Sequence, residues 1–452
     1  MTESKLRITN TLYYIHVFLL ICVATNDGCA QQIFRSSSDS IKYRALAIEI
    51  VDNLENYPKR DNEDLYRLAE SYLVKDIPAH AKGQYAFYDD LIRSNRRDTI
   101  KRIGLYNLKI KEIPQEVFSC VNLIELDISA CKIKRLPKSL NNLKQLETLA
   151  INKSKIKRLR TRMAENETLK NFDVAHNRIR KIPKWMDRFK SLEYLNVSGN
   201  KIRKLPGTLA DCKELASINL SYNRVKNMDM KLVSNPTVKS LNLSHNRLPD
   251  LPFSLSVFSN LEELNLSYNR IQELSKDIPN KRLEFLSLYS NQLDHIPGKL
   301  FAIASLQTLD LSYNAIKIVP ADISKLTSLV SLSTSNNVLV QLPEEIGTLD
   351  KLQNLYLENN RLKALPGSLS KLHLIRLHVE FNQLSEFPSG FERLTALEEL
   401  YVGNNLIHKL PVELLGLENL SVLYFESNFI TMDSGVKDTI EKMKGRQIQI
   451  KY

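Results

Sequence analysis

Apolar residues recur along residues 100–430 with a period of 22 or 23. Within each period they occupy positions 1, 4, 6, 11, 14, 18 and 21, as Leu192, Leu195, Val197 and Ile202 show in the fifth. Positions 3, 5 and 7 alternate with 4 and 6, and successive strand residues face opposite sides of a sheet. The pattern therefore predicts one strand per period, with positions 4 and 6 inward. The fifteen periods begin at Ile100, Leu123, Leu146, Leu169, Leu192, Leu215, Val238, Leu261, Leu283, Leu306, Leu329, Leu352, Leu374, Leu397 and Leu420.

Asparagine occupies position 9 in twelve successive periods. Its amide both donates and accepts hydrogen bonds, so it can satisfy backbone groups where the chain leaves a strand. We expect stacked copies to form a structural ladder. Leu108, Cys131 and Ser154 hold the position in the first three periods, where we expect the ladder to fail and the fold to be irregular. The ladder residues are Asn177, Asn200, Asn223, Asn246, Asn269, Asn291, Asn314, Asn337, Asn360, Asn382, Asn405 and Asn428.

Positions 14 and 15 often hold an apolar residue followed by proline, as in Leu136-Pro137, Leu205-Pro206, Leu342-Pro343 and Leu410-Pro411. Proline fixes φ and lacks an N–H, so it favours an extended or turning path. We therefore do not expect long helices on the side opposite the strands.

This fixed period, with its LxxLxLxxNxL core, resembles the leucine-rich repeat family. The LPxxLxxL form resembles the 23-residue class found in exported bacterial proteins and in Ras-suppressor-type repeat domains. The resemblance covers most of the chain. It implies an α/β fold, a leucine-rich-repeat solenoid or horseshoe with a parallel sheet on its concave side. It also implies a function in binding other molecules.

The segments on either side of the repeats have the features of caps. In residues 31–99, Ile41, Ala45 and Ile48 share one helical face, which predicts a helical N-terminal cap over the open end of the first repeat. A separate interaction domain is the alternative. In residues 431–452, a helix ended by Gly445 and a short final strand would cover the last repeat.

Residues 1–30 have the features of a secretory signal. Lys5 and Arg7 precede an apolar run over residues 12–24, and Gly28-Cys29-Ala30 offers a cleavage site before Gln31. A retained anchor and a lipoprotein linked through Cys29 are the alternatives. Each of the three places the repeats outside the cytoplasm, so we expect a secreted or cell-envelope protein, in the periplasm or at the cell surface.

The outward positions change character along the chain. Repeats 4 to 11 mostly carry small polar pairs such as Asn196 and Ser198, which we expect to hydrogen bond along the sheet. The last four repeats instead carry aromatic residues at position 5, and three of them carry glutamate at position 7, where repeat 14 has Gly403. We expect an exposed stripe that binds a protein partner. Stacking within the sheet without a partner is the alternative. The candidate residues are Tyr356, Glu358, His378, Glu380, Tyr401, Tyr424 and Glu426, with Phe285 and Tyr289 as an earlier aromatic island.

Positive charge is concentrated in one half of the repeats. The formal net charge is +12, and residues 101–230 hold 28 Lys or Arg against 13 Asp or Glu. Position 10 is basic in the first eight repeats, which predicts a basic edge suited to anionic glycans or envelope lipids; a solvated surface is the alternative. We do not expect nucleic acid as a partner of an exported protein. The edge residues we select are Arg178, Lys201, Arg224, Arg247 and Arg270.

Nothing in the sequence indicates catalysis. It contains no GxSxG, P-loop or HExxH motif and no CxxC or zinc-ligand spacing. We therefore expect no catalytic residues, no cofactor and no metal, and we expect a binding scaffold rather than an enzyme.

Overall fold

The computed structural model describes residues 97–160, 166–226, 235–251, 258–275, 281–387 and 390–452, and the two-residue strand β1 (Tyr85–Ala86). The predicted signal, residues 1–30, lies outside the described residues. So does the predicted helical cap up to residue 96, apart from the two residues of β1. Residues 86–452 form one compact unit, which contains all the repeats.

The repeats form one parallel sheet. Strands β2 to β17 pair in sequence order, and position 3 of each repeat lies opposite position 3 of the next, as in Phe285 opposite Thr308. Each of the strands β2 to β16 begins at position 3. The predicted leucine-rich-repeat solenoid fold is therefore confirmed. The strands are β2 (Arg102–Tyr106), β3 (Glu125–Ser129), β4 (Thr148–Asn152), β5 (Asn171–Asp173), β6 (Tyr194–Asn196), β7 (Ser217–Asn219), β8 (Ser240–Asn242), β9 (Glu263–Asn265), β10 (Phe285–Ser287), β11 (Thr308–Asp310), β12 (Ser331–Ser333), β13 (Asn354–Tyr356), β14 (Arg376–His378), β15 (Glu399–Tyr401), β16 (Val422–Tyr424) and β17 (Gln449–Lys451).

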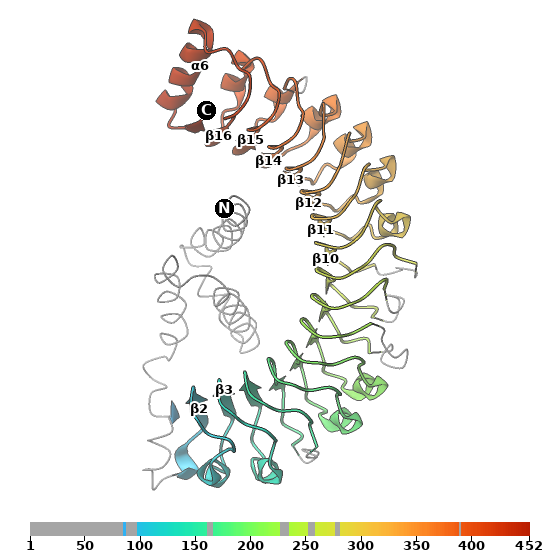
Figure 1. Cartoon of the computed structure of the whole chain (residues 1–452), viewed down its shortest axis with the longest axis vertical. Coiled ribbons are helices and arrows are strands. Elements are labelled where there is room, and N and C mark those ends of the chain that lie inside the picture. The colour runs from blue at the N-terminus through green and yellow to red at the C-terminus, as the bar shows by residue number, and fades with distance from the viewer. Residues whose placement is uncertain are drawn as a thin grey trace. The chain divides into compact units, whose positions relative to one another are not determined.

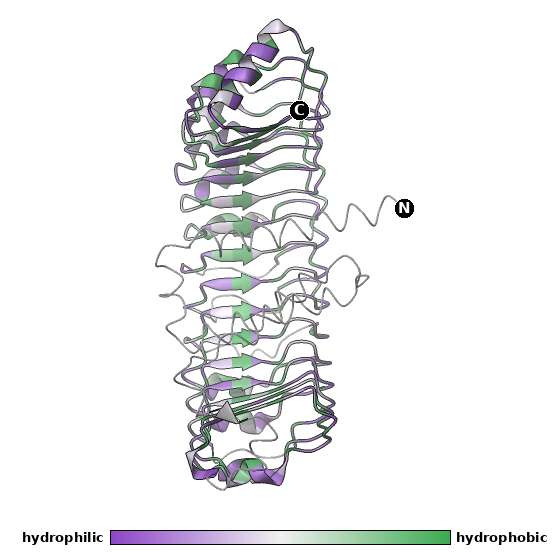
Figure 2. Cartoon of the chain, turned by 90° about the vertical axis from the view of Figure 1, so that its left-hand side faces the viewer, coloured by the Kyte–Doolittle hydropathy of each residue, from purple (hydrophilic) through white to green (hydrophobic). Residues whose placement is uncertain are grey.

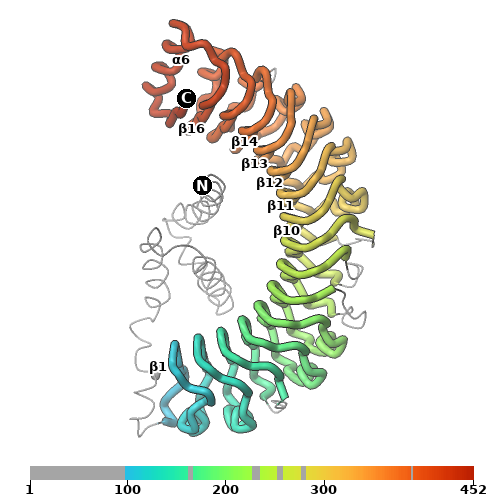
Figure 3. Tube along the Cα trace, viewed as in Figure 1, coloured from blue at the N-terminus to red at the C-terminus, as the bar shows by residue number. Residues whose placement is uncertain are grey.

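This unit curves into an arc, with the strands on its inner side (Figure 1). Each repeat makes one coil of the trace (Figure 3). Viewed from the concave side, the strands lie one above another like the rungs of a ladder (Figure 2). Inside the coils, position 4 residues such as Leu332 and Leu355 have no exposed surface. Their burial drives the stacking, because a single repeat cannot cover its own apolar side.

Short 3₁₀ helices follow the apolar-proline pairs on the outer side (Figure 1). Pro343 precedes η12, and the N–H of Ile346 donates to its carbonyl. Proline is favoured here because its φ is already close to the helical value. An N–H at the start of a helix has no acceptor within the helix, so the lack of one in proline costs no hydrogen bond. The described 3₁₀ helices are η3 (Arg97–Thr99), η4 (Gln115–Ser119), η5 (Lys138–Asn142), η6 (Lys184–Arg188), η7 (Gly207–Asp211), η10 (Gly298–Ala302), η11 (Ala321–Lys325), η12 (Glu344–Thr348), η13 (Gly367–Lys371), η14 (Phe391–Arg393) and η15 (Val412–Gly416).

Position 8 adopts a left-handed backbone conformation in all fifteen repeats, from Asn107 (φ 52°) to Ser427 (φ 56°), with Gly199 (φ 62°) as the one glycine. This conformation turns the chain sharply after each strand and costs non-glycine residues about 1 kcal/mol each. The alternation of apolar and polar positions does not predict this conformation. A signal was present, because no β-branched residue occurs at position 8 in any repeat.

The expected irregularity of the first three repeats is not found in their strands. β2, β3 and β4 have five residues each and pair over all five, whereas the later strands have three. Cys131 also retains part of the asparagine role, since its Sγ lies 3.6 Å from the carbonyl of Leu105, which is equivalent to the Leu311 carbonyl bound by Asn337. Ser154 Oγ instead donates to the carbonyl of Cys131 at 3.2 Å.

The C-terminal end is closed by helix α6 (Ser434–Gly445) and by β17, which pairs with β16. Asp433 caps the helix by accepting from the N–H of Val436 at 2.9 Å. Val436, Ile440 and Met443 are buried. The helix ends at Gly445, as expected, and the left-handed residue that follows it is Gln447 (φ 63°).

Candidate interaction surface

The position 9 asparagines form a ladder beside the sheet, in which nine of the twelve side chains are buried and Asn291, Asn314 and Asn428 are half-buried. Asn337 Nδ2 donates to the carbonyls of Leu311, Thr334 and Ser335 at 3.0 to 3.2 Å, and its Oδ1 accepts from the N–H of Ile316 at 2.9 Å. In all twelve asparagines Oδ1 accepts the position 11 N–H of the preceding repeat. These side chains satisfy backbone groups, so they are not free to contact a partner.

The position 5 asparagines of the middle repeats also serve the backbone. Asn196 Oδ1 accepts the N–H of Ser198 at 3.1 Å, and Asn196 Nδ2 donates to Asp173 Oδ2 across the strands at 3.1 Å. Asn219, Asn242 and Asn265 make the same local bond. Burial raises the pKa of Asp173 to about 7.

Four rings form a continuous row at position 5 of repeats 12 to 15. The ring centroids of Tyr356 and His378 lie 5.0 Å apart, those of His378 and Tyr401 4.2 Å, and those of Tyr401 and Tyr424 4.7 Å. These spacings match the separation of neighbouring strands, so every ring touches the next. The tyrosines are half-buried.

His378 is only 2% exposed, so the expectation of an exposed stripe was wrong for this residue. The rings of Tyr356 and Tyr401 cover it from both sides, which the alternation of positions could not predict. His378 Nε2 lies 3.5 Å from Glu399 Oε2, and Arg376 Nε donates to Glu399 Oε1 at 3.1 Å. The hydrogen bond from His378, together with Arg376, lowers the pKa of Glu399.

Three carboxylates line the row at position 7. Glu358, Glu380 and Glu426 are half-buried, and one oxygen of each, Oε2, is buried without a hydrogen-bond partner among the described residues. Burial raises the pKa of Glu380 to about 8, and the negative charges of Glu358 and Glu426 add to the effect. Glu426 Oε1 pairs with Lys451 Nζ at 2.8 Å.

Phe285 and Tyr289 are not part of this row, since they lie in repeat 9. Tyr289 belongs to a second row of rings. This row begins with Tyr222 and His245, whose centroids lie 3.8 Å apart, and Tyr268 stacks on His245 at 4.0 Å. Tyr289 contacts Tyr268 and continues the row to Tyr313. The stacked rings of this row cover each other's faces, so they offer edges rather than faces to a ligand. Burial lowers the pKa of His245 to about 4.

The basic edge runs along the turn that follows each strand. Arg178, Arg224, Arg247 and Arg270 are exposed, and Lys201 is half-buried. The backbone N–H of each bonds to the position 11 carbonyl of the preceding repeat, which places the five side chains one repeat apart. Among the described residues no ion pair involves any of the five.

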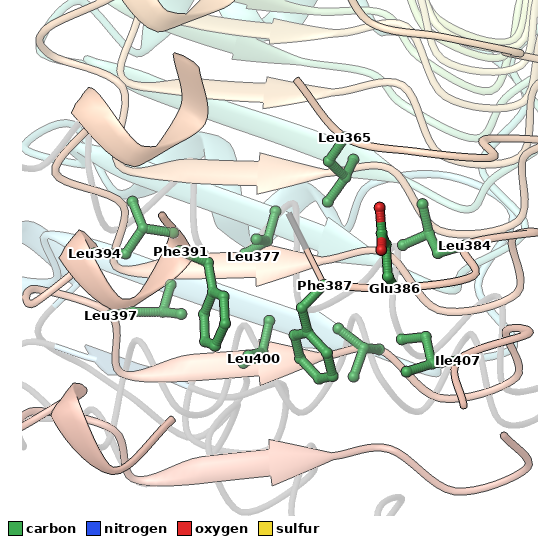
Figure 4. A pocket seen from close by; sticks show the side chains of 11 residues that line it. Leu365, Leu377, Leu384, Glu386, Phe387, Phe391, Leu394, Leu397, Leu400 and Ile407 are labelled. Atoms are coloured by element: carbon green, nitrogen blue, oxygen red, sulfur yellow. The ribbon is translucent and has the colours of Figure 1, made fainter. Parts of the chain in front are cut away.

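One apolar space is found inside the described repeats. Figure 4 shows an apolar space between repeats 13 and 14 lined by Leu377, Phe387, Phe391, Leu400 and similar side chains, with Glu386 as its one charged lining residue. Over the described ranges, no three His, Cys, Asp or Glu side chains are arranged to hold a metal ion. No helix in the described part of the chain combines the length and the apolar character needed to cross a membrane.

Sequence models of leucine-rich repeats match more than half of the chain. The model described as a leucine-rich repeat region matches residues 334–444. The model described as a leucine rich repeat matches 144–202, 167–225 and 281–339, and two further leucine-rich-repeat models match 234–250 and 260–280. No curated protein sequence matches the chain.

Solved structures share the fold. A leucine-rich-repeat protein of Leptospira interrogans is 25% identical with a TM-score of 0.74, covering 78% of this chain and 90% of that one. The functional domain of InlJ from Listeria monocytogenes, which includes a cysteine ladder, is 20% identical with a TM-score of 0.59, covering 74% and 69%.

A third similar structure is the ectodomain of the plant receptor kinase GASSHO1/SCHENGEN3 from Arabidopsis thaliana, solved in complex with CASPARIAN STRIP INTEGRITY FACTOR 2. It is 25% identical with a TM-score of 0.51, covering 76% of this chain and 44% of that one. Repeat period, sheet register and these matches lead to one assignment: the chain is a member of the leucine-rich repeat family.

Proposed function

We propose that this chain is a non-enzymatic, exported scaffold that binds a protein partner on the concave face of repeats 12 to 15. The observation that carries the proposal is the row of Tyr356, His378, Tyr401 and Tyr424 bordered by carboxylates. Tyrosine buries a large area at low entropic cost and is frequent at the energetic centres of interfaces. The small polar residues of the earlier repeats satisfy their own backbone instead.

The complex between GASSHO1/SCHENGEN3 and CASPARIAN STRIP INTEGRITY FACTOR 2 supports a role in protein recognition, since it joins a similar repeat array to a protein partner. Export is supported by the apolar run over residues 12–24 that follows Lys5 and Arg7. We place the protein in the cell envelope or outside the cell.

The test is a comparison of partner capture by the wild type and by a triple variant, Tyr356→Ala, Tyr401→Ala and Tyr424→Ala. Alanine fits at position 5, because Ala150 occupies it in repeat 3. The matched control is Tyr268→Ala, which removes an exposed tyrosine at position 8. Partners captured from a cell-envelope extract should be lost with the triple variant and kept with the control. Equal capture by all three proteins would refute the proposal.

A second candidate function is binding of anionic glycans or envelope lipids along the basic edge. The exposed arginines without ion pairs, spaced one repeat apart, favour it. Binding of heparin, used as an anionic glycan probe, should weaken steeply with salt and be lost when Arg178, Arg224 and Arg247 are changed to Glu. Binding that ignores salt, or no binding, would exclude this function.

A further inference from the structure

The last repeat already holds a cation against the aromatic row. Lys451, on β17, lies 2.8 Å from Glu426 Oε1 and 5.6 Å from the centre of the Tyr424 ring. This geometry combines a charge-assisted hydrogen bond with a cation–π contact. A position 5 ring and a position 7 carboxylate of the same repeat therefore bind a cationic side chain together within this chain.

Gly403 brings two of the carboxylates together. It takes position 7 of repeat 14, between Glu380 and Glu426, where the other three repeats of the group carry glutamate. A Cβ added there would lie 3.2 Å from both Cδ and Oε2 of Glu426, so the carboxylate of Glu426 lies directly over the glycine. The missing side chain thus allows Glu426 to lean towards Glu380.

The free molecule carries an electrostatic cost at this place. Among the described residues, the three Oε2 atoms are buried without hydrogen-bond partners, and buried carboxylates near one another repel. The charged and titratable groups that act on Glu380 from the neighbouring strands are Glu358 and Glu426, with Tyr401 beside them and Lys451 beyond Glu426. Nearby negative charge and burial favour the protonated form of Glu380. A cation would reverse that preference.

We propose that Glu380, Glu426 and the ring of Tyr401 form a site for an arginine or lysine side chain of the protein partner. The exposed part of the ring, between His378 and Tyr424, would contact the aliphatic stem. The two carboxylates would rotate to expose the oxygens that now lack partners and would accept its N–H groups. This inference rests on the proposed function and specifies the chemistry of the partner: a segment bearing an exposed basic residue.

The test uses two capped tripeptides as probes, Gly-Arg-Gly and its citrulline counterpart, which differ in charge and hardly in shape. Titration calorimetry with the full chain at low salt should show the arginine peptide binding about tenfold more tightly. The net charge of +12 repels basic peptides elsewhere, which limits unspecific binding. Near pH 7.5, arginine binding should also release protons, detected as a heat that depends on the buffer.

Three variants locate the site. Glu380→Gln and Glu426→Gln should each abolish the tenfold preference, and Glu380→Gln should also abolish proton release. Gly403→Ala keeps every charge but displaces the carboxylate of Glu426, so it should reduce the preference too. Glu345→Gln, on the exposed outer face, is the matched control and should change nothing. If one variant fails to fold, the other two still decide.

Equal affinity for the two peptides, or a preference that survives in Glu380→Gln and Glu426→Gln, would overturn the inference. If partner capture depends on the tyrosines while the peptides bind equally, the site is wrong but the concave interface stands. If the peptides differ as expected while capture ignores the tyrosines, the interface proposal falls instead.

Discussion

Replacing Glu380 with glutamine should stabilise the protein in alkaline solution. The pKa of Glu380 is raised from its usual 4.5 to about 8 by burial and by Glu358 and Glu426. Between these two values the folded protein holds a proton that the unfolded chain releases, so stability falls as pH rises from about 4.5 to 8. Above pH 8 the folded state carries the full cost of an ionised Glu380.

The shift corresponds to at most about 5 kcal/mol, at about 1.36 kcal/mol per pKa unit. Because Glu380 is only half-buried, solvent screening reduces this to about 1–3 kcal/mol. Glutamine has the same shape and no charge, so Glu380→Gln should exceed the wild type by this amount at pH 9. At pH 4, where Glu380 is protonated in both states, the two proteins should be equally stable.

Urea denaturation at pH 4 and pH 9, followed by circular dichroism, measures the difference. Glu345→Gln is the control, because this exposed carboxylate on η12 should show no gain at either pH. Equal stability of Glu380→Gln and wild type at pH 9 would refute the reasoning. So would a gain that persists unchanged at pH 4, since that would arise from packing rather than charge.

Three further substitutions test the scaffold. Asn337→Ala leaves the N–H of Ile316 and three carbonyls without their partner and should cost about 2–4 kcal/mol in urea denaturation, with faster hydrogen exchange at that N–H; an unchanged midpoint would contradict the ladder. Gly199→Ala places a Cβ 2.6 Å from His176 Nδ1 at a φ of 62°, so it should lower the free energy of unfolding by about 1–3 kcal/mol and lower the Tm; an unchanged Tm would contradict the predicted strain. Leu355→Ala opens a core cavity and should cost about 2–5 kcal/mol, whereas a loss below about 1 kcal/mol would contradict close packing.

The repeat period and the inward residues could be predicted because they depend on local alternation alone. Leu332 and Leu355 fall at position 4 of their repeats, and every strand from β2 to β16 begins at the expected position. The apolar-proline pairs likewise indicated the absence of long outer helices, since the geometry of proline is a local property.

The candidate site was only partly predictable, because it depends on contacts between repeats. The sequence placed Tyr356, His378 and Tyr401 on the outward face, but the burial of His378 arises from the rings on both sides of it. The clustering of carboxylates depends on how Glu426 leans over Gly403, a side-chain arrangement that spacing alone does not determine.

The row of Tyr222, His245 and Tyr268 was missed for a similar reason. Position 8 leaves the strand in a left-handed conformation, which turns these rings against one another. The sequence shows three aromatic residues near arginines, and only the turn explains why their faces are covered.

Blocking the concave face with a bulky label tests the central claim most directly. Cys120 and Cys212 are buried with pKa values raised to about 11, and Cys131 is buried as well, so these thiols should resist a maleimide. With Cys22 and Cys29 changed to serine, a cysteine at Val422 on β16 or at the open outer position Gly367 can carry polyethylene glycol.

Partner capture from an envelope extract is then compared for the two labelled proteins. Polyethylene glycol at Val422→Cys should abolish capture, because this residue lies on the concave face of repeat 15, whereas the same label at Gly367→Cys should leave capture intact. Capture that survives the label at Val422→Cys and is lost with the label at Gly367→Cys would contradict the account.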